Sequence, residues 1–304
     1  MIGTNGMKKP VGLIGIGIMG SAMAKNLIEA GFDVVGFDVV PEAGQRLREL
    51  GGRTASSPRE VAEAAPIVLI SLPGSEALAK AVSGPDGLAA AHGEGQIGIE
   101  CSTLPIEVKQ AAHDAMKERG KILLDCPLSG TGAQAVNKDL VVLGSGERGA
   151  FDRCAEVFAG MSRAQHYLGG FGAGTAMKLI ANHLVTIHNV AAAEAMVLGK
   201  RAGIDPAVVY EALADSAATS RMFQMRGPLM RDARYDEPTA TIRTQLKDIS
   251  IIDGFAAGLD CALPVYAAAS QIYHAGAAMG LKDKDTAAVC AVLEALHGME
   301  RKKP

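Results

Sequence analysis

A glycine-rich turn between a strand and a helix constrains this chain more than any other feature. Residues 11–16 form an apolar strand pattern that runs into G-I-G-I-M-G, and a helical pattern then continues to Gly31. A second apolar strand, 34–37, ends on Asp38. Such glycines permit a tight turn, close backbone approach to a pyrophosphate and close helix–strand packing, while the helix N-terminus attracts phosphate. The sequence therefore predicts a dinucleotide site, whose contacts are expected from Gly15, Gly17, Ile18, Met19 and Gly20.

Asp38 bears on which dinucleotide binds. A carboxylate at the end of this strand accepts hydrogen bonds from the adenosine ribose hydroxyls. Asp38 is followed by Val39, Val40 and Pro41, and no arginine or lysine comes before Arg46. A 2′-phosphate would meet a carboxylate and no nearby cation, so the sequence favours NAD over NADP as the cofactor.

The order of strand and helix patterns predicts two domains. Strands are expected at 67–72, 97–100, 122–126 and 140–143, separated by helices such as 41–50 and 106–119, which indicates an α/β fold with a doubly wound, largely parallel sheet of the Rossmann type. From about Gly172 alanine-rich helical patterns take over. The helices expected there are 173–202, 206–214, 241–258, 264–279 and 285–297. The predicted division is a dinucleotide-binding domain at 1–170 and an all-helical domain at 171–304.

A lysine and an asparagine stand near the start of the helical part. Lys178 and Asn182 are four residues apart, so they share one face of a helix. Their neighbours are small and apolar, and burial of a lysine disfavours its charged form and lowers its pKa. Proton transfer at a hydroxyl or carbonyl carbon needs such a group. The same pattern also fits an ordinary helix whose lysine extends its charged end to solvent.

Composition limits the partners that the chain is expected to have. A net charge of −3 over 304 residues gives no broad basic field, so nucleic acid and anionic membranes are not implied. The polar residues 1–9 lack the apolar core of a signal peptide, and no run of residues resembles a membrane span. Five scattered cysteines without a C-x-x-C pair indicate reduced thiols in a cytoplasmic protein. His183 and His188 have no third ligand at a useful spacing, so no metal is expected.

Six segments in order resemble the motifs of the β-hydroxyacid dehydrogenases, the family of 3-hydroxyisobutyrate dehydrogenase and tartronate semialdehyde reductase. The resemblance spans residues 11 to about 296. Its segments are the glycine motif with a methionine between the glycines (12–27), S-L-P (71–73), C-S-T-L-P (101–105), D-C-P-L-S-G-T (125–131), G-x-G-x-x-x-K-x-x-x-N (172–182) and the late K-D pair (247–248).

The resemblance implies a role for several residues. In this family a long helix joins the two domains and places the lysine, here Lys178, beside the nicotinamide, where it exchanges the hydroxyl proton of the substrate. Asn182 would orient that lysine or a substrate hydroxyl. Ser129 and the backbone N–H groups of Gly130 and Thr131 would hold the substrate carboxylate. The further cofactor contacts that the resemblance implies are Leu72, Pro73, Thr103 and Lys247.

The chain departs from the family pattern around the expected substrate loop. Thr131, Gln134 and Lys138 stand where glycine is common, and His183 replaces an asparagine. These departures leave the substrate open rather than the reaction, and a hydroxyl with an amide would suit a polar substrate. Near this loop Cys126 has no paired histidine and is expected to be inert.

Several functions compete for this sequence. The leading one is an NAD-dependent 3-hydroxyacid dehydrogenase or semialdehyde reductase acting on a small carboxylate, assembled as a homodimer or homotetramer through small-residue helix faces such as 191–193. A decarboxylating enzyme of the 6-phosphogluconate dehydrogenase type would need a longer helical domain and a basic cluster. Lys178 argues against an imine reductase, and Lys178 with Asn182 argues against a dinucleotide sensor without turnover. The helical second half argues against a methyltransferase.

Overall fold

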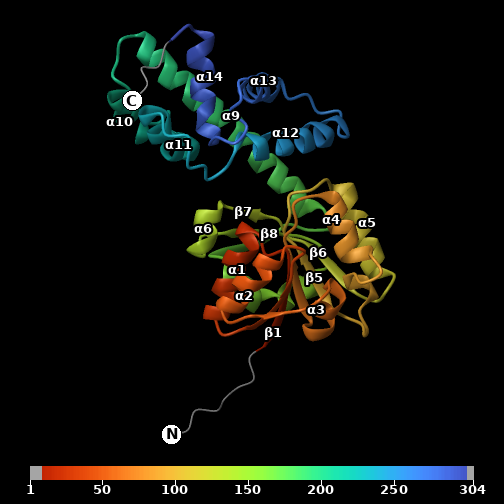
Figure 1. Cartoon of the computed structure of the whole chain (residues 1–304). Coiled ribbons are helices and arrows are strands. Elements are labelled where there is room, and N and C mark those ends of the chain that lie inside the picture. Colours follow the sequence, from red (N-terminus) through yellow and green to blue (C-terminus); the bar gives the residue numbers. More distant parts are fainter. Residues whose placement is uncertain (1–8, 300–304) are drawn as a thin grey trace. The chain divides into compact units, whose positions relative to one another are not determined.

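The protein, described from a computed structural model over residues 9–299, divides into two compact units (Figure 1). The first unit ends at Lys178 and the second begins at Leu179. This division falls inside the longest helix, α9 (Ala173–Arg201), whereas the boundary expected at 170/171 lies in the loop before it. The expectations about residues 1–8 lie outside the described residues.

A six-stranded sheet forms the centre of the first unit, and all of its strand pairs are parallel. The strand order is β3-β2-β1-β4-β5-β6, so the direction of winding reverses between β1 and β4. This order confirms the predicted doubly wound Rossmann fold, in which ligands bind at the carboxyl ends of the strands beside the reversal. The strands are β1 (Pro10–Ile14), β2 (Asp33–Phe37), β3 (Arg53–Thr54), β4 (Ile67–Ile70), β5 (Ile97–Glu100) and β6 (Ile122–Asp125).

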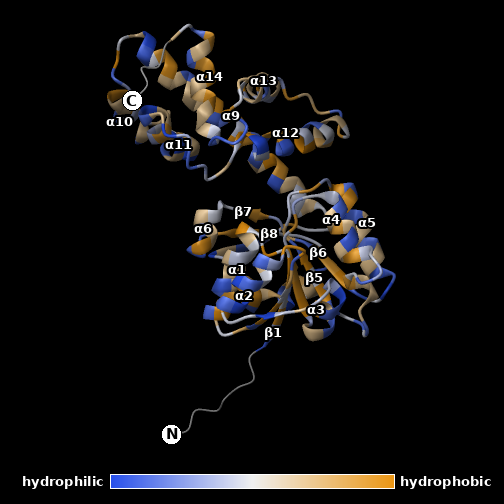
Figure 2. Ribbon diagram, viewed as in Figure 1, coloured by the Kyte–Doolittle hydropathy of each residue, from blue (hydrophilic) through white to orange (hydrophobic). Residues whose placement is uncertain are grey.

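Alternating strand residues feed two separate cores, one on each face of this sheet. Leu13 and Leu69 pack with α1 and α2, whereas Ile14 and Ile70 pack with α3, α4 and α5. The strands are accordingly apolar on both faces, as their orange colour in Figure 2 shows. The helices of this unit are α1 (Ile18–Glu29), α2 (Pro41–Glu49), α3 (Pro58–Ala64), α4 (Ser75–Ser83), η1 (Leu88–Ala90), α5 (Ile106–Lys117), α6 (Gly132–Val136), α7 (Arg148–Arg153) and α8 (Ala155–Met161).

A second, three-stranded sheet follows the first and corrects one prediction. The strand expected at 140–143 is β8 (Val141–Gly144), which pairs with β7 (Leu128–Ser129) and β9 (Ala164–Tyr167) rather than with the six-stranded sheet. After β6 the chain continues through Pro127, which lacks an N–H group for a further ladder bond, and Asp125 and β7 lie in one antiparallel register against 141–145, so the chain reverses only between β7 and β8. The sequence did not predict β9, because its residues A-Q-H-Y are mostly polar and partly exposed.

The second unit is built from helices, as predicted. After α9 come α10 (Pro206–Ala214), α11 (Arg221–Asp232), α12 (Ile242–Ala257), α13 (Pro264–Ala278), η2 (Thr286–Ala288) and α14 (Val289–Leu296). The expected helix at 285–297 is thus divided into η2 and α14, and α11 lies outside the helix ranges given above. Arg226 of α11 is buried and pairs with Asp285 at 2.9 Å, which makes it a structural salt bridge. Within residues 9–299, no helix combines the length and the apolar character that a membrane span requires.

Candidate active site

The three motif glycines differ in what surrounds them. Gly15 has φ of +88°, and a Cβ there would lie 2.1 Å from the Ser71 carbonyl oxygen. A Cβ on Gly20 would lie 2.0 Å from the Gly15 carbonyl oxygen. These two glycines are required by the fold itself. Gly17 is exposed, precedes α1, and has no described atom within 4 Å of its Cβ position. The open space at Gly17 therefore faces solvent and is available to a ligand.

The carboxylate of Asp38 binds the glycine turn. One oxygen accepts the Ile16 N–H at 2.6 Å, and the other accepts the Val40 N–H at 2.9 Å. Arg46, one turn into α2, brings its Nη2 to 3.5 Å from the Ile16 carbonyl oxygen. The sequence argument that no cation lies near this end of β2 is therefore wrong, because helical geometry returns Arg46 to the turn.

The other two predicted cofactor segments follow β4 and β5. The Leu72 N–H donates to Ser102 Oγ at 2.9 Å, so the two segments are joined directly. Leu72 also lies beside Gly15, since its Cδ2 is 3.1 Å from the Cβ position of that glycine. Pro73 is exposed and Thr103 is partly buried in the turn before α5. The glycine turn, the Leu72 segment and the Thr103 segment thus meet at the carboxyl edge of the sheet.

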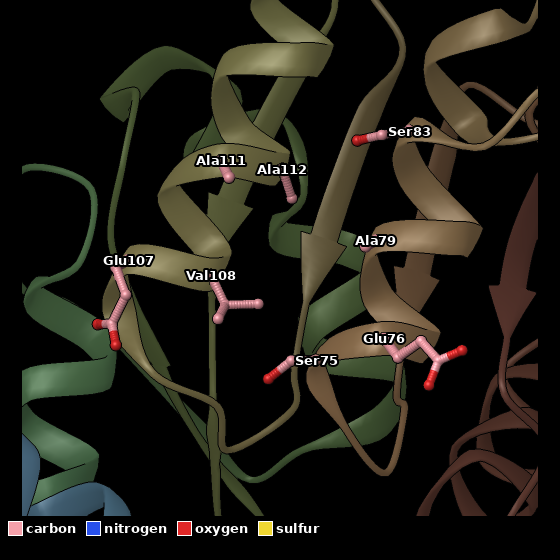
Figure 3. A pocket seen from close by; sticks show the side chains of 8 residues that line it. All are labelled: Ser75, Glu76, Ala79, Ser83, Glu107, Val108, Ala111 and Ala112. Atoms are coloured by element: carbon pink, nitrogen blue, oxygen red, sulfur yellow. The ribbon is translucent and has the colours of Figure 1, made fainter.

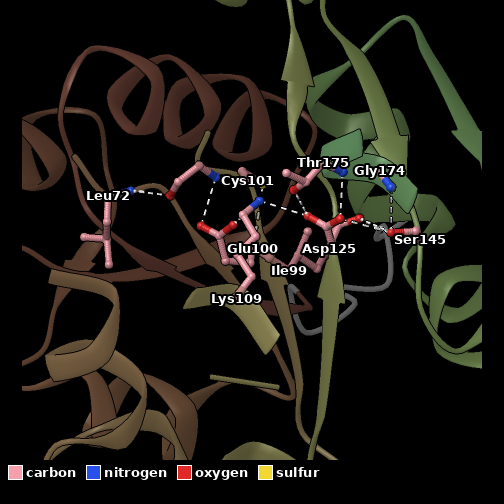
Figure 4. A network of polar contacts seen from close by, with 10 residues as sticks. Leu72, Ile99, Glu100, Cys101, Lys109, Asp125, Ser145, Gly174 and Thr175 are labelled. Carbon is pink, nitrogen blue, oxygen red and sulfur yellow. Dashed lines mark hydrogen bonds and ion pairs between the residues drawn. The ribbon is translucent and has the colours of Figure 1, made fainter. Parts of the chain in front are cut away.

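Behind this edge lies a buried charge network that the sequence reasoning missed (Figure 4). Glu100 and Asp125 end neighbouring strands in register, and Lys109 of α5 bridges them with contacts of 2.5 and 2.8 Å. All three side chains are fully buried. Burial alone would lower the pKa of Lys109, but the charges of Glu100 and Asp125 and their hydrogen bonds raise it. The sequence does show an acidic residue, Glu100 or Asp125, at the end of each of these two apolar strands. That pattern could have indicated a buried cation between them.

The network extends to the start of α9. Asp125 accepts the Thr175 N–H at 2.7 Å and the Thr175 hydroxyl at 2.7 Å. The Gly174 N–H donates to Ser145 Oγ at 2.9 Å, and that hydroxyl donates to Asp125. The first turn of α9 is therefore capped by side chains from β6 and from the end of β8.

The expected carboxylate-binding loop is held by its own side chains. Ser129 ends β7, and Gly130 is exposed with φ of +137°. The Thr131 N–H donates to Gln134 Oε1 at 3.0 Å, and Thr131 Oγ1 accepts the Gln134 N–H, which completes a capping box at the start of α6. The Gln134 amide also donates to Asp139 at 2.9 Å. The two departures that suggested a polar substrate thus bond to each other.

Lys178 and Asn182 lie on α9, as the spacing predicted, and both are partly buried. In the second unit, Asn182 Nδ2 donates to Asp248 Oδ2 at 2.9 Å, and Lys247 Nζ lies 3.2 Å from Asp248 Oδ1. The late K-D pair is therefore joined to Asn182. The Lys247 side chain is exposed on α12.

Other residues singled out in the sequence have structural surroundings. His183 stacks on Tyr266 with a centroid separation of 5.2 Å. Burial raises the pKa of the Cys126 thiol well above its usual value, which agrees with an inert group. All five cysteines are free, and all but Cys261 are buried. Among the described residues, no group of three or more His, Cys, Asp or Glu side chains could hold a metal.

A pocket of about 440 Å³ lies between α4 and α5 (Figure 3). Its lining is largely small and apolar, with Glu76 and Glu107 at its edge and no cationic side chain. None of the predicted site residues lines it. Two carboxylates without a cation make this pocket unsuited to an anionic dinucleotide or substrate.

Two family models match consecutive parts of the chain. Residues 10–177 match the family model for the NAD binding domain of 6-phosphogluconate dehydrogenase, and residues 172–293 match the family model for NAD-binding of NADP-dependent 3-hydroxyisobutyrate dehydrogenase. L-threonate dehydrogenase from Cupriavidus necator is 32% identical, over 96% of this chain and 98% of that protein. Glyoxylate/succinic semialdehyde reductase 2 from Arabidopsis thaliana is 31% identical, over 95% of this chain and 81% of that protein. The solved 3-hydroxyisobutyrate dehydrogenase from Mycobacterium tuberculosis is 26% identical with a TM-score of 0.86, over 94% of this chain and 99% of the other.

Proposed function

We propose that Lys178 is the general acid and base of the reaction that this chain catalyses. The chain belongs to the β-hydroxyacid dehydrogenase family and is a nicotinamide-dependent oxidoreductase. The observation that carries this proposal is the place of Lys178. Lys178 is the one ionisable side chain in the first two turns of α9. The start of α9 is hydrogen-bonded to Asp125 at the carboxyl edge of the six-stranded sheet, where the cofactor segments meet. The substrate is a small 3-hydroxy acid or the corresponding semialdehyde carboxylate.

The residues present fit a nicotinamide dinucleotide. Gly17 leaves open space at the N-terminus of α1, where unpaired N–H groups favour a pyrophosphate. Ile18 and Met19 follow in the same turn, and Asp38 would accept the ribose hydroxyls. At the carboxyl ends of β4 and β5 the cofactor would contact Leu72, Pro73 and Thr103. Lys247 of α12 is a further proposed cofactor contact. When bound, the cofactor supplies hydride chemistry at its nicotinamide ring.

We propose NAD as the preferred form of the cofactor. The Asp38 carboxylate opposes a 2′-phosphate by its charge, and its two hydrogen bonds hold it at the turn. Arg46 is the competing feature, because its guanidinium lies near the same turn and could pair with that phosphate.

Lys178 would act at the reacting oxygen of the substrate. On oxidation its neutral amine takes the hydroxyl proton, and on reduction its ammonium returns a proton to the carbonyl oxygen. Asn182 would orient this lysine or a substrate hydroxyl, and Asp248 in turn fixes the Asn182 amide. Ser129 and the N–H groups of Gly130 and Thr131 would bind the substrate carboxylate. The Thr131 N–H can do so only by exchanging its bond to Gln134.

The test is Lys178→Ala, assayed by NADH absorbance across 3-hydroxy acids and semialdehydes that differ in their C2 substituent. General acid–base groups contribute about 10²–10⁴-fold, so we expect kcat to fall by that factor while NADH binding and folding are kept. Asn182→Ala should lose less. Lys80→Ala, which removes an exposed lysine paired with Glu76, is the control and should turn over like the unmodified protein. Near-normal turnover of Lys178→Ala would refute the mechanism.

Two alternatives can be distinguished when CO₂ release is measured beside NADH absorbance. The first family model carries the name of 6-phosphogluconate dehydrogenase, and an enzyme of that type would release CO₂ with each NADH formed. A dinucleotide sensor would bind NADH and turn over none of the substrates. The model that matches the second unit carries a 3-hydroxyisobutyrate dehydrogenase name, which supports simple dehydrogenation.

We also propose a cytoplasmic homodimer or homotetramer. Large apolar side chains are exposed on the second unit, among them Leu198 at 72% and Val265 at 63%, and a partner subunit would cover such a surface. Five free thiols support a reducing compartment. Light scattering coupled to size exclusion tests the assembly, and cell fractionation tests the location.

A further inference from the structure

The buried network described above raises the question of why a folded core would contain it. Three fully buried charged side chains, Glu100, Lys109 and Asp125, stand where apolar residues could pack. Replacing a buried ion pair by apolar residues of similar volume is often neutral or stabilising, so net stability does not account for such a group. Removing one member alone is costly, because the others are left buried without a partner. The contacts of Asp125 suggest a different role.

Asp125 holds the start of α9 at two points. Its Oδ2 accepts the Thr175 N–H and its Oδ1 accepts the Thr175 hydroxyl, both at 2.7 Å. Ser145 adds a third point by accepting the Gly174 N–H at 2.9 Å. A Cβ on Gly174 would lie 2.3 Å from the Leu143 carbonyl oxygen, so the helix is seated directly against the strand ends. These contacts fix both the rotation of α9 about its axis and its axial position.

Lys178 lies one turn beyond these contacts. It follows Gly174 by four residues and Thr175 by three, so it is a neighbour of each of them on the surface of α9. Any rotation or shift of the first turn therefore moves the lysine directly. Figure 4 shows the capping residues of α9 and the charged residues behind them in one continuous chain of contacts.

The other end of this chain of contacts reaches the cofactor segments. Lys109 holds the same Asp125 oxygen that accepts the Thr175 hydroxyl, and Glu100 holds Lys109. Glu100 also accepts the Ser102 N–H at 2.9 Å, and Ser102 accepts the Leu72 N–H. One set of polar contacts thus joins the Leu72 segment, the residue before Thr103 and the first turn of α9.

We propose that Asp125 is a positioning residue for Lys178, that Thr175 is the group through which it acts, and that Lys109 and Glu100 hold the Asp125 carboxylate in place. The proposal rests on the proposed catalytic role of Lys178. The network sets the lysine relative to the cofactor segments, and it need not touch substrate or cofactor.

Thr175→Val is the variant that tests this proposal most cleanly. It keeps the shape of a side chain that is 1% exposed and keeps the N–H bond, and it removes only the hydroxyl contact to Asp125. Lys109→Met is unsuitable, because it would leave two buried carboxyl groups without their cation. Ser162→Ala is the matched control, since it removes another buried hydroxyl bond of 2.7 Å in the same unit, away from α9.

We expect Thr175→Val to lower kcat by about 10-fold, since small misplacements of a reacting group cost up to about 10²-fold. The dissociation constant of NADH should stay nearly unchanged, because the cofactor segments keep their own bonds. The part of the kcat–pH profile that reports ionisation of Lys178 should shift. Thr175→Ser should restore both kcat and the pH profile. Ser162→Ala should lower the melting temperature and leave kcat and the pH profile unchanged.

The possible failures are distinct. If Thr175→Val and Ser162→Ala behave alike, with lower melting temperatures and normal kcat, the positioning role is wrong. If Thr175→Val loses NADH binding along with kcat, the network serves the cofactor site, and the proposal is again overturned. If Lys178→Ala itself turns over normally, the proposed function fails, whatever Thr175→Val does.

Discussion

The clearest prediction concerns Gly17, because the structure separates its role from those of Gly15 and Gly20. Alanine at Gly17 meets no described atom within 4 Å, and the backbone there, with φ of −72° and ψ of −159°, is extended and accepts a side chain. Loss of a good N-cap residue costs up to about 1 kcal/mol, and the smaller entropy of the unfolded chain offsets about 0.4–1 kcal/mol. The stability of Gly17→Ala without ligand should therefore stay close to that of the unmodified protein.

Dinucleotide binding should respond quite differently to the same substitution. The added methyl group occupies the space through which a pyrophosphate would reach the N–H groups at the start of α1. A hydrogen bond to a charged group contributes about 1.5–3 kcal/mol, so losing one such bond raises the dissociation constant by about 10- to 150-fold. Titration calorimetry with NADH measures this change, and thermal unfolding without ligand measures stability.

Gly20→Ala is the matched comparison within the same motif. Its Cβ would lie 2.0 Å from the Gly15 carbonyl oxygen, so this variant should unfold at a clearly lower temperature even without ligand. The reasoning would be refuted if Gly17→Ala bound NADH normally. It would also be refuted if the two variants lost stability equally.

Three further predictions rest on single features of the structure. Arg46→Ala should lower kcat/KM for NADP by about 10-fold, as loss of a charged hydrogen bond implies, and leave NAD nearly unchanged; equal losses would contradict the placement of Arg46. Lys138→Gly should stabilise the protein by about 0.5–1 kcal/mol in urea unfolding, because Lys138 has φ of +56° after α6, where glycine is unstrained; a lower midpoint would contradict this. Iodoacetamide at pH 8 should label Cys261 alone, because the other four thiols are buried and burial raises the pKa values of Cys101, Cys126 and Cys154; rapid labelling of several thiols in the folded protein would oppose it.

Most of the first unit could be predicted because its signals are local. The glycine turn needs particular residues at fixed positions, and the strands at 97–100 and 122–125 are short apolar runs bounded by polar residues. Lys178 and Asn182 could be placed on one helix from spacing alone. Strand β8 shows the limit of this reasoning, since an apolar run does not reveal which sheet it joins. That choice depends on the reversal between β7 and β8 and on their pairing, which is a tertiary property.

The charged residues of the site were harder to interpret, because their roles depend on partners far away in the sequence. Lys109 looks like one more polar residue of an amphipathic helix, yet it is fully buried between two strand ends. Arg46 looks too distant from Asp38 to matter, yet α2 returns its guanidinium to the glycine turn. In both cases the sequence contains the residue, and only the packing of a helix against the sheet shows what it contacts.

The departures around the substrate loop suggest why specificity resists interpretation from sequence. Thr131 and Gln134 have the groups expected of a site for a polar substrate, yet each satisfies the other and together they cap α6. Lys138 ends the same short helix in a left-handed conformation, with N–H bonds from Lys138 and Asp139 back to Ala135 and Gln134. The three departures therefore act on one five-residue helix, which begins directly after Ser129 and Gly130. A substrate carboxylate that uses the Thr131 N–H must replace the Gln134 amide oxygen, so selection at this loop depends on that exchange as well as on the shape of the substrate.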